Sequence, residues 1–391
     1  MITDKDFLQE RIHTVRRIVR GSWIPAEDEV ERSHELPARI VSEMREQGLF
    51  RFLIPPAFGG DGMSCEELAL INIEMSQCSV AFRTRIANNI GVAANAILHG
   101  GSEQQKAEHL PGIASGATLA AVGVSEPDFG SEATAMTTSA RPHGQGWVLN
   151  GEKAFITNGP IADLYVVFAR TGEPGSRAGG ISAFLVKPDD AGFRRGPAYR
   201  SMGQHGAPYS SLYFKDCVLP ADRLLGLETG KGFKAAWHAF RFQRIQLAAL
   251  CIGPAIRLVE EALKWTASRR QFGKAISEHQ LIQGKLADCQ TEIAAARALV
   301  LETARNYDEG RDVTMEASIC KYFSTEMACR VADRVVQMFG ARGYFADFSC
   351  VERLYRDLRS SRFAEGTSEI HQITIAREMF KRAGLDSGAA E

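Results

Sequence analysis

The sequence lacks the patterns of a disulfide-stapled, metal-binding or membrane-spanning protein. Its eight cysteines stand singly, without a C-x-x-C pair, so we expect free thiols in a reducing compartment. The nine histidines form no H-x-x-x-H or H-E-x-x-H arrangement, which leaves a metal ion without ligands at usable spacing. The charged start, MITDKDFLQERIH, lacks an apolar signal segment, and no run of about 18 apolar residues follows. These absences predict a cytoplasmic protein with no metal and no membrane span.

An excess of charge of one sign is also missing. Lysine and arginine number 46 and aspartate and glutamate 47, which gives a formal net charge of −1. Nothing global therefore attracts nucleic acid or an anionic membrane. A G-x-S-x-G motif is absent, and with it the usual sign of a hydrolase nucleophile. The 391 residues, 45% of them hydrophobic, are enough for a large core and for two or three domains.

Three stretches with different hydrophobic periods follow one another. Apolar residues recur at three and four in 1–117, short β-type runs fill 118–228, and the helical period returns in 229–391. The last stretch carries a bundle seam at Ile282, Leu286, Cys289, Ile293, Ala296 and Val300. This order predicts an α+β fold with an amino-terminal helical domain, a middle antiparallel, barrel-like β-domain and a carboxy-terminal helical bundle.

Three local patterns carry expectations of their own. Asn150-Gly151 lies between two β-type runs and predicts a hairpin turn, because both residues accept positive φ. The segment 230–235 (GKGFKA) fits G-x-G-x-x-A, but a polar loop precedes it instead of a buried strand. It is therefore expected to lead from a loop into a helix and not to bind a dinucleotide. The tail, 387–391, is expected to be unfolded.

Four segments are polar or glycine-rich where packing alone does not require it. The loop 125–131 (SEPDFGS) offers hydroxyls and free N–H groups to a phosphate or a flavin edge. The segment 155–159 (FITNG) ends a strand with an aromatic face and a hydroxyl. The segment 269–273 (RRQFG) closes a helix with paired guanidinium groups, which can bind a diphosphate.

The fourth segment, 365–369 (EGTSE), places the Glu365 carboxylate just before a helix that runs toward Gly384. Either Thr367 or Ser368 can cap that helix. Taken singly, the four segments are better explained as a turn, a hairpin strand, a solvated helix end and an N-cap.

Together, in this order and in this helix–sheet–helix frame, the segments resemble the acyl-CoA dehydrogenases. The resemblance runs from about residue 5 to residue 382. It rests on the motifs SEPDFGS, LNGEKAFITNG, RRQFGKAISEHQLIQGKLAD, QMFGARGYFADFSCVERLYRD and FAEGTSEIHQITIARE.

The resemblance implies that FAD binds between the β-domain and the carboxy-terminal helices. The isoalloxazine ring would lie near Val124, Ser125, Phe155 and Thr157. Further cofactor contacts would come from Thr367 and Ser368. The adenine-diphosphate half would be held by Arg269, Phe272, Gln280, Gln337, Gly340 and Ala341. In this family the last group comes partly from a neighbouring subunit, which implies a homo-oligomer, most often a tetramer.

By the same resemblance the substrate is an acyl thioester and Glu365 is the catalytic base. Glu365 would remove the α-proton, and the β-hydrogen would leave as hydride to the flavin. The thioester would lie near Ser131, Arg244 and Gly366, and an electron-transfer flavoprotein or a similar acceptor would reoxidise the enzyme. A carboxylate desolvated beside an acyl chain should have a raised pKa.

Three positions depart from the family pattern. Phe155 stands where tryptophan is common, and Ala364 replaces a tyrosine that usually precedes the base. Arg241 stands where an aspartate or asparagine often contacts the ligand, although the arginine that follows in the family matches Arg244. These changes leave open the acyl group and the choice between coenzyme A and a carrier protein.

Two other functions fit the same scaffold. An acyl-CoA oxidase or an N-hydroxylating monooxygenase would pass electrons to oxygen. Glu365 favours dehydrogenation over hydroxylation, but these residues do not separate an oxidase from a dehydrogenase. A non-enzymatic flavoprotein that binds nucleic acid is disfavoured by the neutral charge and the intact base.

Arg83 is a candidate substrate-binding residue. It falls three residues before Ile86 and seven before Ile90, on the apolar face of its helix. A buried guanidinium should meet an anion, and an internal salt bridge is favoured over a group on the ligand. The segment 82–84 (FRT) resembles the Tyr-Arg-Ser of glutaryl-CoA dehydrogenases, in which the arginine binds the distal carboxylate of the substrate.

Overall fold

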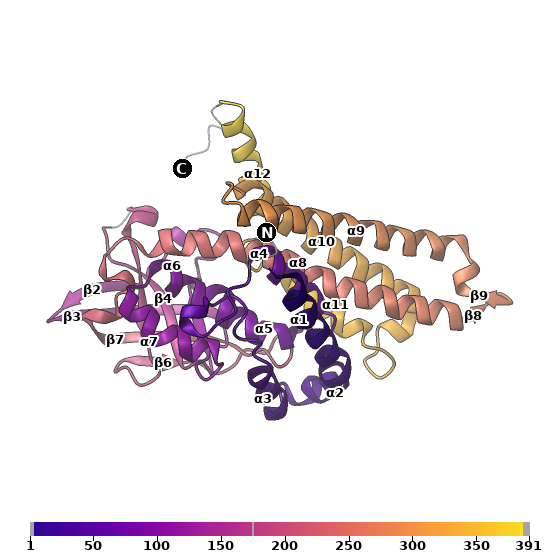
Figure 1. The fold of residues 1–391 in the computed structure, drawn as a ribbon, viewed down its shortest axis with the longest axis horizontal. Coiled ribbons are helices and arrows are strands. Elements are labelled where there is room, and N and C mark those ends of the chain that lie inside the picture. Colours follow the sequence, from indigo (N-terminus) through magenta and orange to yellow (C-terminus); the bar gives the residue numbers. More distant parts are fainter. Residues whose placement is uncertain (1–3, 174–175, 386–391) are drawn as a thin grey trace.

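The computed structural model describes residues 4–173 and 176–385, and the tail expected to be unfolded lies outside them. Helices come first, a sheet follows, and longer helices complete the chain (Figure 1). The fold class predicted from the sequence is confirmed.

The amino-terminal helices form one layer beside the sheet. They are α1 Lys5–Ile18, α2 Ile24–Ser33, α3 Ala38–Glu46, α4 Cys65–Met75, α5 Val80–Ala87, α6 Asn95–Gly100 and α7 Glu103–Ala114, with π-helical turns at Val19–Trp23 and Asn88–Ala94. Helix α4 begins sharply because the Ser64 hydroxyl accepts from the Glu67 N–H while the Glu67 carboxylate accepts from the Ser64 N–H.

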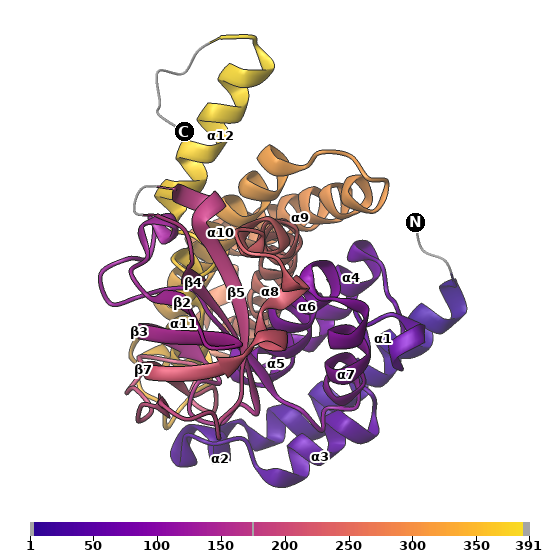
Figure 2. The same cartoon turned by 90° about the vertical axis from the view of Figure 1, so that its left-hand side faces the viewer.

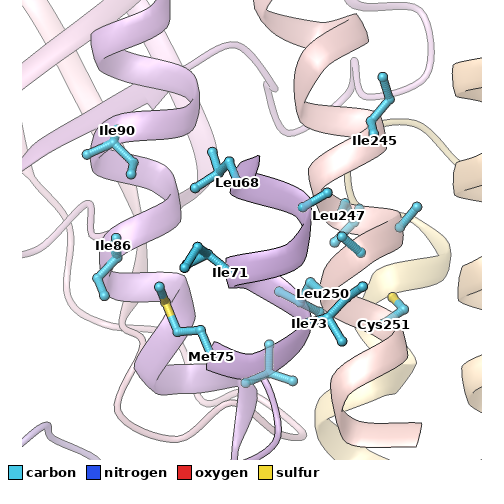
Figure 3. Packing of buried hydrophobic residues seen from close by; sticks show 14 of the residues in the cluster. Leu68, Ile71, Ile73, Met75, Ile86, Ile90, Ile245, Leu247, Leu250 and Cys251 are labelled. Carbon is cyan, nitrogen blue, oxygen red and sulfur yellow. The ribbon is translucent and has the colours of Figure 1, made fainter. Parts of the chain in front are cut away.

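Helix α4 is buried on almost every side. Figure 3 shows it between the helix that carries Ile86 and Ile90 and helix α8 (Gly232–Ser268), which carries Ile245 and Leu250. The middle of α4 (CEELALINIEM) is mostly apolar, as a helix packed on two sides requires. Asn72 is a polar residue within that stretch and is buried in the core.

The middle unit is a seven-stranded sheet. Its strands are β1 Ala120–Gly123, β2 Ser139–His143, β3 Gly146–Thr157, β4 Leu164–Arg170, β5 Ile181–Val186, β6 Phe193–Arg195 and β7 Tyr209–Pro220. Along the sheet the order is β1-β4-β2-β3-β7-β6, with β5 also paired to β4. Most neighbours run antiparallel, while β1 and β2 pair with β4 in parallel.

The hairpin predicted at Asn150-Gly151 is wrong. Both residues lie inside β3, and the turn into β3 is at residues 144–145, between His143 and Gly146. Gly151 instead lies at a β-bulge, where the register of β3 against β7 shifts between Leu149 and Gly151. Gly151 has a φ of 141°, and a Cβ there would come within 2.6 Å of the Thr138 hydroxyl oxygen.

The carboxy-terminal unit is built around α8, which begins at Gly232 as predicted. The other elements are β8 Arg270–Gln271, β9 Lys274–Ala275, α9 Gln280–Asp308, α10 Thr314–Phe339, α11 Val351–Arg359 and α12 Ser368–Arg382. Short 3₁₀ turns lie at Pro56–Phe58, Ala133–Ala135, Arg177–Gly180, Ala221–Arg223, Leu225–Leu227, Ile276–Glu278, Gly340–Gly343 and Ser360–Arg362. Helix α12 packs against α10, and its carboxy-terminal end projects from the molecule (Figures 1 and 2).

Helix α8 runs from the sheet to the far end of the bundle (Figure 1). Its stretch Ala239–Ser268 is long and apolar enough to cross a membrane, but 94% of the most apolar window is buried inside the protein. It is therefore a core helix, and its long apolar surface is used by the helices packed around it.

Candidate active site

The candidate base lies in a short loop between the turn Ser360–Arg362 and helix α12. The Thr367 hydroxyl caps that helix by accepting from the Ile370 N–H at 3.3 Å. Glu365 and Gly366 both have left-handed backbones, with φ of 56° and 96°. This conformation suits the glycine and strains the glutamate by about 1–2 kcal/mol. The left-handed backbone gives the Glu365 side chain a different direction from the one it would have at an ordinary helix start.

Three cations on three different helices lie near enough to the Glu365 carboxylate to act on it electrostatically, although none forms an ion pair with it among the described residues. They are Arg83 on α5, Arg244 on α8 and Lys321 on α10. Burial raises the pKa of the Glu365 carboxyl, and the three positive charges oppose that rise without cancelling it. The direction agrees with the one expected from the sequence.

Arg83 is buried, with 5% of its surface exposed, but it forms no ion pair within 4 Å with a carboxylate of the described residues. Its Nε donates to Asn72 Oδ1 at 3.2 Å. Burial lowers the pKa of Arg83 to about 10, and Cys251 and Glu365 work against that shift. The internal salt bridge favoured by the sequence is therefore wrong. The described partner of Arg83 is the amide of Asn72 on α4, where the sequence predicted a carboxylate.

A chain of amides continues from Arg83. Asn72 Nδ2 donates to Gln246 Oε1 at 2.7 Å, and Gln246 Nε2 donates to the Cys65 carbonyl at 2.9 Å. Arg83, Asn72, Gln246 and Gln243 also line a cavity of about 10 Å³ whose other walls are apolar. That volume is about enough for one water molecule. These amides were missed from the sequence, although all three are polar residues that the structure buries.

The two arginines near the start of α8 differ in their pairing. Arg241, one of the departures from the family pattern, is 3.2 Å from the Asp312 carboxylate. Arg244 makes no hydrogen bond or ion pair with the described residues, and its Nε is buried without a partner. Burial lowers the pKa of Arg244, and Glu365 opposes the shift. Arg244 therefore keeps its donors free for another group.

The loop after β1 is fixed by a buried lysine. Lys153 Nζ donates to Glu126 Oε1 at 2.8 Å and to the Val124 carbonyl at 3.0 Å, and the Ala154 N–H donates to the Ser125 carbonyl at 2.9 Å. These bonds hold Val124 and Ser125 against β3. Thr157 is the last residue of that strand.

Phe155 presents an open ring beside this loop. It has a left-handed φ of 61° and is 65% exposed, although its neighbours Ala154 and Ile156 are buried. Its only described ring contact is with Tyr199, at 5.6 Å between centroids. The Ser125 hydroxyl forms no hydrogen bond with the described residues, so an uncovered ring and a free hydroxyl stand together. These features fit a flat, hydrogen-bonding ligand such as a flavin. Ser131, in the same loop, is exposed.

The candidate residues for the far half of the cofactor lie elsewhere. They are all exposed and gather around the β8–β9 hairpin and the last turn of α10: Arg269, Phe272, Gln280, Gln337, Gly340 and Ala341. A stack of Trp265 on Phe339, with centroids 5.3 Å apart, supports this end. In Figure 1 the hairpin is at the opposite end of the molecule from the sheet, so one chain does not bring this group to Phe155.

The comparisons with known proteins match the whole chain to one family. The amino-terminal, middle and carboxy-terminal domains of acyl-CoA dehydrogenase match residues 8–117, 121–217 and 230–380. Cyclohexane-1-carbonyl-CoA dehydrogenase of Geobacter metallireducens is 36% identical over 95% of this chain and 96% of its own. Acryloyl-CoA reductase (NADH) of Anaerotignum propionicum is 39% identical over 92% and 90%.

The fold comparison agrees. The structure of butyryl-CoA dehydrogenase from Megasphaera elsdenii superposes with a TM-score of 0.92 at 31% identity, over 97% of this chain and 100% of that one. The chain therefore belongs to the acyl-CoA dehydrogenase family. It is an oxidoreductase that acts on CH–CH groups, and proteins of this family bind FAD.

Two further residues near Glu365 were missed from the sequence. Lys321 and His371 are fully buried and contact the backbone of the Glu365 loop. A signal for Lys321 existed, since it lies four residues after Ala317 and one after Cys320, on the apolar face of α10.

Proposed function

We propose that the protein dehydrogenates the α,β bond of an acyl thioester, with Glu365 removing the α-proton. The observation that carries this proposal is the place of the Glu365 carboxylate in a partly buried site, where the charges of Arg244, Lys321 and Arg83 act on it. Positive charge there stabilises the ionised base and the negative charge that develops on the thioester. The Glu365 N–H donates to no described acceptor, so it is free to bind the thioester oxygen.

The cofactor would be non-covalent FAD, which accepts the hydride from the β-carbon when bound. Val124, Ser125, Phe155 and Thr157 would hold its ring. Thr367 and Ser368 are weaker candidates, because the first caps α12 and the second donates to Glu326 at 2.7 Å.

The adenine-diphosphate half would be bound by the exposed group around the β8–β9 hairpin of a neighbouring subunit. Its distance from the sheet within one chain supports this arrangement (Figure 1). We therefore infer a homo-oligomer, most simply a tetramer, with domain limits near residues 117 and 228, working in the cytoplasm.

The substrate would lie against Gly366, Arg244 and Ser131, with the end of its acyl chain toward Arg83. Because Arg83 and its amide neighbours have no carboxylate partner, we infer an acyl group that carries a polar or anionic substituent. The residues do not distinguish coenzyme A from a carrier protein.

Spectroscopy of the purified protein tests this function. FAD should be released at one per chain on denaturation, and an acyl thioester should bleach the bound flavin without oxygen. The probes are butyryl-CoA, cyclohexane-1-carbonyl-CoA and glutaryl-CoA, each also as an acyl-carrier-protein thioester. A folded, colourless protein that gains no activity with FAD, or a flavoprotein that no thioester bleaches, would contradict the proposal.

The alternative function is an acyl-CoA oxidase on the same residues. Reoxidation of the bleached enzyme separates the two functions. We expect slow reoxidation by air and fast reoxidation by an electron-transfer flavoprotein or a dye. Fast reoxidation by oxygen with release of peroxide would identify an oxidase.

A further inference from the structure

Lys321 is the most unusual residue around the Glu365 loop. It is fully buried in α10, and its ammonium group donates to two backbone carbonyls, of Arg362 at 3.0 Å and of Gly366 at 2.6 Å. These carbonyls stand on either side of Glu365. One side chain therefore ties the two ends of the loop to the same point on the bundle.

Burying an ammonium group between carbonyls is expensive. Burial lowers the pKa of Lys321 to about 8, although Cys251 and Glu365 oppose the shift. A methionine or leucine would fill such a core position without this cost. The lysine is thus better explained by what it does to the loop than by packing.

His371 binds a third carbonyl of this segment, that of Glu365. It is fully buried in the first turn of α12, and its Nε2 lies 3.1 Å from the Glu365 carbonyl oxygen. Burial lowers the pKa of His371 to about 3, with Arg244 and Lys321 acting in the same direction, so the ring is neutral. Because its partner is an acceptor, Nε2 carries the proton.

Together these bonds fix the carbonyl groups of Arg362, Glu365 and Gly366; two of the bonds come from α10 and one from the first turn of α12. The Glu365 N–H has no described acceptor, and its carboxylate lies within electrostatic reach of Arg244, Lys321 and Arg83. A left-handed backbone at a glutamate is strained, and it persists only where contacts of the surrounding residues hold it. Without these bonds, the loop could relax toward an ordinary helix start.

We propose that Lys321 and His371 are positioning residues that hold Glu365 in its left-handed conformation, with its N–H left free of an acceptor in the loop. This inference rests on the proposed role of Glu365 as the base. Neither residue hydrogen-bonds the Glu365 carboxylate, and both bind the backbone of the loop. Lys321 also supplies one of the charges that oppose the rise in the pKa of Glu365.

The first test measures the loop itself and needs no substrate. Hydrogen–deuterium exchange of peptides covering 360–371 is compared in His371→Leu, His371→Gln and the unmodified flavoprotein. Leucine removes the donor, whereas glutamine keeps an N–H at a similar reach. We expect faster exchange in this segment alone for His371→Leu and near-normal exchange for His371→Gln. Unchanged exchange in His371→Leu would overturn the proposal, whatever the activity of the enzyme.

The second test separates binding from chemistry, using the acyl-CoA of the panel that bleaches the flavin fastest. At saturating thioester we expect His371→Leu and Lys321→Met to bleach up to about 10²-fold more slowly, because a small misplacement of a base costs that much. The apparent Kd should stay within about threefold, the deuterium isotope effect at the α-carbon should rise, and His371→Gln should restore the rate.

Two results would contradict positioning. One is a normal bleaching rate in both His371→Leu and Lys321→Met. The other is a loss of rate that follows loss of FAD or of the melting temperature, which would make the residues merely structural. If instead Glu365→Gln turns over normally while the exchange results hold, the proposed base is wrong but the anchoring of the loop stands.

Discussion

Replacing Arg83 by methionine gives the sharpest test of the substrate. The change keeps an unbranched side chain of similar length and removes the charge and the donors. In the structure Arg83 Nε is occupied by Asn72, and the two terminal nitrogens have no described partner. We therefore expect these two nitrogens to be the part of Arg83 that binds a substituent on the acyl chain.

The magnitude follows from that geometry. A charge-assisted hydrogen bond contributes about 1.5–3 kcal/mol, which corresponds to about 10- to 160-fold in kcat/KM at 1.36 kcal/mol per factor of ten. The loss should appear with glutaryl-CoA, whose acyl group ends in a carboxylate, and mainly in KM. Butyryl-CoA, which has no such group, should be spared or improved, because a buried positive charge without a partner is removed.

The assay is steady-state oxidation of both thioesters with a dye as electron acceptor. Arg83→Lys keeps the charge without the planar fork and should lose less than Arg83→Met. Arg85→Met removes an equal charge from the same helix and serves as the matched control. Equal losses on the two substrates, or a preference of the unmodified enzyme for butyryl-CoA, would refute the reasoning.

The remaining predictions concern the base and the buried pair below the loop after β1. Glu365→Gln should keep the fold and FAD but bleach about 10²–10⁴-fold more slowly in stopped flow; near-normal bleaching would place the base elsewhere. Lys153→Met should lower the urea-unfolding free energy by about 3–5 kcal/mol, and adding Glu126→Gln should recover part of it. Burial alone would raise the pKa of Glu126, but Lys153 and the Thr137 and Thr138 donors hold it at about 2. The stability that ionised Glu126 contributes is complete above pH about 4.5 and is lost as the pH falls toward 2. Over that range the urea midpoint of Glu126→Gln should therefore fall less than that of the unmodified protein.

The arrangement of the fold was predictable because periodicity records burial. Apolar spacings of three and four gave the helical stretches, and the seam from Ile282 to Val300 lies on α9. The hairpin at Asn150-Gly151 failed because glycine marks a bulge as readily as a turn. Only the contact with Thr138, which comes just before β2, decides between the two.

The candidate site was predictable where a charge breaks an apolar face. That signal found Arg83, and it was equally present at Lys321, where it was overlooked. It could not name the partners, since Asn72 comes from α4 and the loop carbonyls come from another part of the chain. Partners across elements depend on packing, which a single sequence does not record.

Two opposing effects set the basicity of Glu365. Burial raises the pKa of its carboxyl, and the charges of Arg244, Lys321 and Arg83 oppose that rise. An entering acyl chain would displace water and strengthen every one of these interactions. An anionic substituent that pairs with Arg83 would withdraw one of the three cations from Glu365 and so raise the basicity of the carboxylate. In that arrangement the correct substrate both fills the site and strengthens the base, whereas a plain alkyl chain leaves Arg83 facing the base. Because Arg83→Met removes that cation for every substrate, the rate of proton removal should not fall, and the loss with glutaryl-CoA should appear in KM.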